Sequence, residues 1–109
     1  MPRDREPPGL GAARTLRQQL RGLLRREELS FAELRDVFGL GVRALEEELR
    51  HVERTARSAG ERLHVGPARC LGCGFAFRDR DARHLHAPGR CPRCRSERIT
   101  DPTFRIEPA

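Results

Sequence analysis

The sequence predicts a small α+β protein, on three observations. The first half of the chain repeats leucine and phenylalanine at helical spacing, as amphipathic helices packed on one core do. Two short segments, at residues 63–65 and 103–107, alternate apolar and polar residues in the manner of strands. Four cysteines form two Cys-x-x-Cys pairs in the second half. A chain of 109 residues holds one ordinary domain or two very small ones, and a bound metal commonly stabilises such small pieces.

The chain opens on a predicted disordered tail that leads into a first helix. Residues 1–11 are rich in proline, glycine and charge, a composition that does not build a core. The helix is expected over residues 12–27, where leucines recur at i, i+4, i+7 and i+8. Its apolar stripe consists of Leu16, Leu20, Leu23 and Leu24.

A helix–turn–helix pattern follows. Ser30 and Glu33 form a capping box that begins a second, short helix, and Gly39 suits its C-terminus. A third helix is predicted from about Val42 to Ser58. The side chains expected to build the shared core are Leu34, Phe38, Leu40, Leu45, Leu49, Val52 and Ala56. Since another helix precedes this pattern and a strand follows it, residues 12–66 resemble a winged helix-turn-helix.

The cysteine pairs predict a metal site. The ligands are expected to be Cys70, Cys73, Cys91 and Cys94, with 17 residues between the pairs. Four thiolates at this spacing are typical of a structural zinc site that holds one ion and leaves no open position for a substrate. Gly74 and Pro92 suit the tight turns of the two pairs. A disulfide framework and an iron or redox-active site are the alternatives.

Short strands are expected around the metal. Phe75 and Phe77 alternate just after the first cysteine pair, and Phe104 and Ile106 alternate in the last strand. Strands packed around four thiolates make a zinc ribbon, which is predicted to occupy residues 67–109.

The charge of the chain is concentrated near the cysteines. The net charge is +6, all basic side chains are arginine, and residues 65–109 alone carry +4. Such an excess favours a polyanion such as nucleic acid, although it also suits a merely soluble surface. There is no membrane-length apolar stretch, no signal peptide and no catalytic constellation. We therefore expect a cytoplasmic protein that is not an enzyme and has no small-molecule substrate.

The order of these parts, with the segment from "PARCLGCGFAFRDR" to "GRCPRCRSERITDPTFRIE", resembles a family described as predicted transcriptional regulators, a helix-turn-helix fused to a zinc ribbon. The resemblance covers about residues 15–107 and implies zinc on the four cysteines, double-stranded DNA as the partner and, commonly, a homodimer. The arginines expected to contact DNA are Arg43, Arg50 and Arg54 in the third helix and Arg78, Arg80, Arg93 and Arg95 in the ribbon.

Two features depart from a generic helix-turn-helix. Arg35 stands where a small residue usually lets the helices approach, and Glu46, Glu47 and Glu48 are expected to repel phosphates from the third helix. The alternative function is therefore a protein-binding adaptor that uses this acidic helix. The ribbon is also similar to the zinc domain of the nickel-delivering hydrogenase maturation chaperone, but the chain opens Met1-Pro2 rather than Met-His. His84 and His86 are expected to be solvated loop residues.

Overall fold

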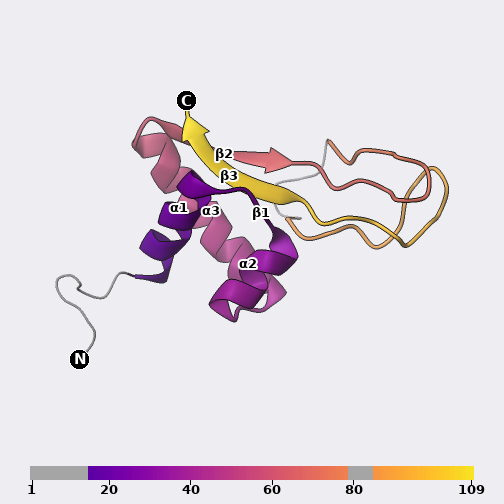
Figure 1. Ribbon diagram of the computed structural model, residues 1–109, viewed down its shortest axis with the longest axis horizontal. Coiled ribbons are helices and arrows are strands. Elements are labelled where there is room, and N and C mark those ends of the chain that lie inside the picture. The colour runs from indigo at the N-terminus through magenta and orange to yellow at the C-terminus, as the bar shows by residue number, and fades with distance from the viewer. Residues whose placement is uncertain (1–14, 79–84) are drawn as a thin grey trace.

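The structure is a computed structural model that describes residues 15–78 and 85–109 (Figure 1). Its elements, in chain order, are α1 (Leu16–Arg26), β1 (Leu29–Ser30), α2 (Phe31–Phe38), α3 (Val42–Ser58), β2 (Glu61–Gly66) and β3 (Thr103–Pro108). The predicted tail, residues 1–11, lies outside the described residues. No helix within the described ranges combines the length and the apolar character needed to cross a bilayer.

Side-chain caps fix where α1 and α2 begin. Thr15 Oγ1 accepts from Gln18 N at 3.1 Å, and Gln18 Oε1 accepts from Thr15 N at 3.0 Å. Ser30 and Glu33 exchange the same pair of hydrogen bonds, at 3.1 and 2.8 Å, which confirms the predicted capping box. Gly39 ends α2 with φ at +64°, a conformation that costs glycine little. The first helix begins later than the leucine pattern alone predicts, because the Thr15 cap sets its first turn.

The three strands form one antiparallel sheet in the order β1-β3-β2. Leu63 lies opposite Ile106, and Val65 lies opposite Phe104, so β2 pairs with β3 along its whole length. β1 is only two residues long and pairs Leu29 with Phe104 on the other side of β3. The chain between the neighbouring strands β2 and β3 comprises residues 67–102, and most of its described part projects away from the helices in Figure 1. We call this segment the ribbon insert.

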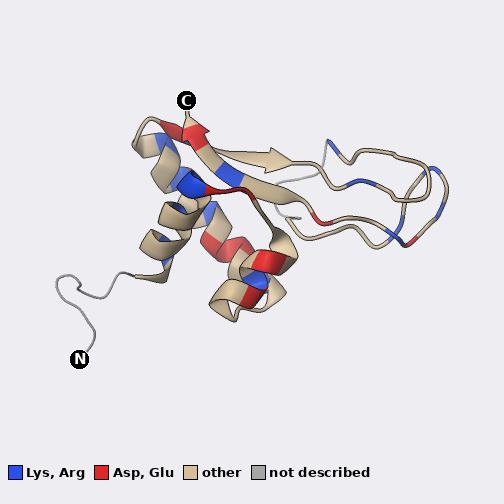
Figure 2. Ribbon diagram, viewed as in Figure 1, with Lys and Arg blue, Asp and Glu red and all other residues tan. Residues whose placement is uncertain are grey.

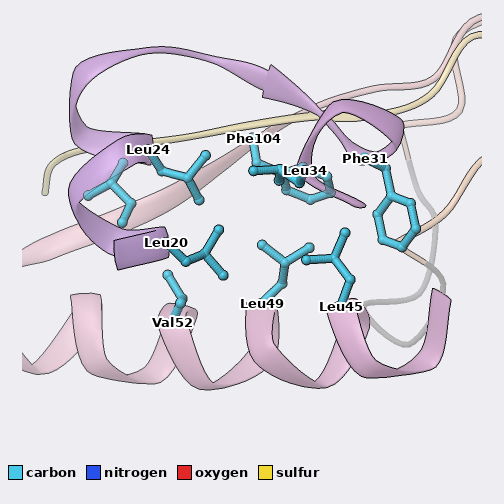
Figure 3. Close-up of a cluster of buried hydrophobic side chains, with 9 residues drawn as sticks. Leu20, Leu24, Phe31, Leu34, Leu45, Leu49, Val52 and Phe104 are labelled. Carbon is cyan, nitrogen blue, oxygen red and sulfur yellow. The ribbon is translucent and has the colours of Figure 1, made fainter. Parts of the chain in front are cut away.

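The hydrophobic core lies between the helices and the sheet (Figure 3). Its buried members are Leu20 and Leu24 of α1, Phe31 and Leu34 of α2, Leu45, Leu49 and Val52 of α3, and Phe104 and Ile106 of β3. The helix contributions match the predicted apolar stripes, except that Leu16 is only half-buried and does not belong to the cluster. The predicted placement of Phe104 and Ile106 around the metal is wrong, because β3 turns both side chains into the helical core. The last strand thus belongs structurally with the helices, and we call α1 to α3 together with β1 to β3 the helical part.

The strand predicted after the first cysteine pair is also absent from the described residues as a regular element. Single antiparallel bridges pair Arg69 with Ala76 and Cys70 with Ile99. The rings of Phe75 and Phe77 meet edge to face with their centroids 5.0 Å apart. The two side chains are two residues apart and lie on the same side of the chain, where they contact each other.

Candidate metal centre and basic surface

The ribbon insert brings the four predicted cysteine ligands together. All four Sγ atoms lie within 4.8 Å of one another, and the Cys70–Cys94 and Cys73–Cys91 sulfur pairs are 3.5 and 3.6 Å apart. A tetrahedral zinc ion with Zn–S distances of about 2.3 Å requires sulfurs about 3.8 Å apart. The residues present therefore fit one zinc ion, and all four ligand positions are taken by protein.

The two cysteine pairs form matching turns. Gly72 N donates to Cys70 Sγ at 3.2 Å, and Arg93 N donates to Cys91 Sγ at 3.4 Å. In the residue after each pair, Gly74 N donates to the Cys70 carbonyl at 2.9 Å and Arg95 N to the Cys91 carbonyl at 3.0 Å. The N–H groups of Gly72 and Arg93 stabilise negative charge on the Cys70 and Cys91 sulfurs, which a zinc ligand must carry, and those of Gly74 and Arg95 close the turns.

The second turn differs from the first in one strained residue. Gly74 has φ at +80°, as its turn predicts, while Arg95 holds the equivalent position with φ at +66°. Arg95 is the only residue other than glycine with positive φ in the described ranges. A side chain in this left-handed conformation costs about 1–2 kcal/mol.

The crowding of the thiols shows why a cation is needed. Burial opposes the Cys70 thiolate, but the Cys73 N–H and a hydrogen bond with Cys94 lower the pKa of Cys70 to about 6. The Ser96 N–H favours the Cys94 thiolate, yet contact with the Cys70 sulfur and burial raise the pKa of Cys94 to about 12. The Cys70 thiolate is thus favoured and the Cys94 thiolate opposed, and a divalent cation between the sulfurs would favour both.

Comparison with known proteins agrees with this geometry. Residues 67–109 match the family model described as the PF0610 rubredoxin-like zinc beta-ribbon domain, and residues 15–64 match the PF0610-like N-terminal model. The solution NMR structure of protein PF0610 from Pyrococcus furiosus is 33% identical to this chain, with a TM-score of 0.68. The match covers 85% of this chain and 89% of that one. The chain belongs to the PF0610 family. None of the curated proteins compared matches it.

The four cysteines of this PF0610-family protein form a structural zinc site. The predicted DNA-binding arginines spread over two further surfaces. Arg43 and Arg54 are exposed on α3, Arg50 is half-buried there, and all three line a hollow of about 490 Å³. In the ribbon insert Arg78, Arg93 and Arg95 are exposed, whereas Arg80 lies outside the described residues.

The acidic run on α3 is not the exposed stripe that the sequence suggests. Glu46 is buried, with 7% of its surface exposed. Glu48 Oε1 accepts from Arg17 Nε of α1 at 2.7 Å. Glu47 alone of the three is exposed, at the rim of the arginine-lined hollow. The expected repulsion of phosphates by three carboxylates is therefore an overestimate.

The contacts of Glu46 were not foreseen from the sequence. Its Oε2 accepts from Leu85 N at 3.1 Å and lies 2.7 Å from His86 Nδ1. Burial opposes the charged form of Glu46, but the hydrogen bonds from His86 and Leu85 N outweigh it and lower the pKa of Glu46. His86 lies in a loop, as predicted, but its half-buried side chain also contacts Glu46, while His84 lies outside the described residues. No pattern in the sequence joins positions 46 and 86, since their contact depends on how the insert folds back on α3.

Proposed function

We propose that this PF0610-family protein is a DNA-binding transcription regulator in which α3 enters the major groove and the ribbon insert lies along the phosphates. The observation that carries the proposal is the charge of α3. Arg43, Glu47, Arg50 and Arg54 follow one another at spacings of four, three and four residues, so they share one helix face. With Glu46 buried and Glu48 paired to Arg17, this face carries three arginines against one exposed carboxylate.

The order of the elements supports a winged helix-turn-helix as the scaffold. A helix, a short strand, two helices joined by a tight turn and two further strands follow one another along the chain. In such a fold the second helix of the pair reads the major groove, and here that helix is α3. Arg35, which departs from the generic helix-turn-helix pattern, is exposed, and its Nε donates to the Leu40 carbonyl at 3.1 Å. Its side chain therefore spans the turn between α2 and α3.

The ribbon insert supports the same proposal, since it occupies the place of the loop between the two wing strands β2 and β3. Figure 2 shows basic positions distributed along the insert out to its far end, with few acidic ones. Two of the exposed arginines, Arg93 and Arg95, lie in and beside the second cysteine turn. A rigid zinc-bound turn that presents arginine suits contact with phosphates, which fixes register without reading sequence.

Arg43→Ala tests base reading by α3. Arg43 is exposed in the first turn of α3, where recognition helices contact base edges. We expect the variant to lose about 1–3 kcal/mol of specific binding and to relax the preference at one base position. A selection from random duplexes followed by affinity titration measures both quantities. Arg25→Ala is the matched control, because Arg25 is an exposed α1 arginine paired with Glu61. Equal effects of the two variants contradict base reading by Arg43.

Arg95→Gly tests the phosphate contact, because the substitution should raise the stability of the ribbon and lower its affinity for DNA. Glycine takes the left-handed conformation of Arg95 freely, so the ribbon should gain up to about 1 kcal/mol of stability. Loss of the guanidinium should weaken binding to every duplex alike. It should also make the slope of log affinity against log salt concentration shallower by about one unit. Thermal melts and titrations at two salt concentrations measure these changes. A variant that is more stable and binds DNA unchanged would show that Arg95 contacts no phosphate.

The wild-type titration decides between the regulator and the adaptor. A regulator prefers one duplex sequence at physiological salt, whereas an adaptor that uses the α3 face shows no duplex preference. Affinity that is weak for every duplex and vanishes as the salt concentration rises would contradict the regulator proposal. The burial of Glu46 leaves the adaptor hypothesis only Glu47 as an exposed member of its acidic run.

A further inference from the structure

Glu46 fastens the ribbon insert to α3. It is the only charged side chain buried in the described part of the chain. Both of its hydrogen-bond partners, Leu85 N and His86 Nδ1, belong to the insert. Leu85 packs against the hydrophobic core, and the His86 ring centroid lies 6.4 Å from that of Phe31. Residues 85 and 86 are therefore held on the helical part by one carboxylate and the apolar contacts around it.

The segment that Glu46 holds leads directly into the metal site. Residues 85–90 contain no helix or strand, and they end at the buried ligand Cys91. The segment is therefore anchored at one end by Glu46 and at the other by the metal. When the metal is removed, the Cys91 turn loses its fixed position, and the segment regains conformational freedom that opposes its contact with α3.

Release of this segment would change the surface of α3. A carboxylate without hydrogen-bond partners is not stable in a buried position, so Glu46 would become hydrated where it lies. Glu46 lines the same hollow as Arg43 and Arg50. The face that carries three arginines and Glu47 would then carry a second exposed negative charge.

We propose that Glu46 is a positioning residue that couples zinc loading of the ribbon to the charge of the α3 surface. With zinc bound, residues 85 and 86 cover the Glu46 carboxylate and α3 presents a net basic face. Without zinc, the carboxylate is uncovered and the face repels phosphate more strongly. The coupling itself does not depend on what α3 binds, whereas its effect on DNA rests on the proposed function.

The coupling must act in both directions. If zinc favours the contact between Glu46 and the insert, that contact favours zinc by the same factor. Glu46→Gln keeps the size of the side chain but removes the charge that strengthens both hydrogen bonds. We expect this variant to bind zinc roughly tenfold more weakly, within the range typical of coupled sites. Glu48→Gln is the matched control, because Glu48 pairs with Arg17 of α1 and with no described residue of the insert.

Three measurements on the full chain test the proposal. Hydrogen exchange of the Leu85 amide should be slow with zinc and should accelerate after chelation. A chelator competition should show the tenfold loss of zinc affinity for Glu46→Gln and no loss for Glu48→Gln. For duplex DNA, zinc-free Glu46→Gln should bind roughly fivefold more tightly than zinc-free wild type, about the effect of one unit charge at 4 Å in a water-like medium.

Leu85 exchange that is unchanged by chelation, or equal zinc affinity of the two variants, would overturn the coupling. Equal duplex affinity of zinc-free wild type and Glu46→Gln would overturn its effect on the α3 surface. If zinc-loaded wild type prefers no duplex, the proposed function fails, and the exchange and zinc measurements still decide whether Glu46 couples the two parts. Circular dichroism confirms that each variant is folded.

Discussion

Cys91→Ser is expected to abolish stoichiometric zinc binding and to release the ribbon insert, while the helices remain folded but less stable. Structural zinc sites of this kind contribute about 10–16 kcal/mol of apparent binding free energy, and a hydroxyl cannot replace a buried thiolate ligand. No zinc ligand belongs to the hydrophobic core cluster, so the helices keep their own packing. Elemental analysis after dialysis against a chelator, together with far-ultraviolet circular dichroism, measures both effects.

The loss of helix stability follows from the chain connection. Zinc joins the two cysteine turns and thereby shortens the loop between β2 and β3. Without it, the loop between β2 and β3 has no cross-link, and closing this longer loop costs roughly 1 kcal/mol more. The helical melting temperature should fall by about 4–8 °C. Pro92→Ala, in the same turn but with all thiols intact, is the control. Retention of zinc by Cys91→Ser, or complete loss of helical signal at 25 °C, would contradict this division.

Phe104→Ala is expected to destabilise the helical part by about 3–5 kcal/mol, the usual result of emptying a fully buried aromatic site. Phe104 is completely buried in the central strand, and its ring centroid lies 6.3 Å from that of Phe31. Total stability of such a small domain is of the order of 5–15 kcal/mol, so the variant should be close to unfolding at room temperature. Denaturant unfolding followed by circular dichroism gives the difference directly.

The control for this prediction is Phe77→Ala. Phe77 is half-buried in the ribbon insert and pairs with Phe75, away from the core cluster. It should leave the unfolding free energy of the helices unchanged. If Phe104 instead served the metal site, as the sequence pattern suggests, Phe104→Ala would release zinc and spare the helices. That result would contradict the observed role of β3.

The features predicted correctly are those that short stretches of sequence determine. The Ser30–Glu33 capping box, the Gly39 end of α2 and the two cysteine pairs each depend on residues within one turn of chain. Local hydrogen-bonding and backbone preferences decide them, so the sequence identifies them without knowledge of the fold. The apolar faces of the helices were equally predictable, because the spacing of the apolar residues indicates which side of a helix faces the core.

The features missed depend on contacts between distant residues. Alternation at Phe104 and Ile106 identifies a strand but not its partner, and proximity in sequence wrongly favoured the metal site. β1 was not predicted, because two residues are too few to show the alternation typical of a strand. Glu46 resembles its neighbours Glu47 and Glu48 in sequence, and only the return of residues 85 and 86 onto α3 distinguishes it. The metal ligands were thus predictable, whereas the surface around α3 required the folded structure.

The position of β3 also determines the order in which the molecule can be assembled. The strand at the middle of the sheet follows the whole ribbon insert in the chain, so a ribosome delivers all three helices before the strand that completes their core. Until then the apolar faces of α1 and α3 lack Phe104 and Ile106. Pairing between β2 and β3 spans a long sequence separation, which slows folding. Early capture of zinc by the two cysteine turns would bring the strand ends together and shorten this exposed interval.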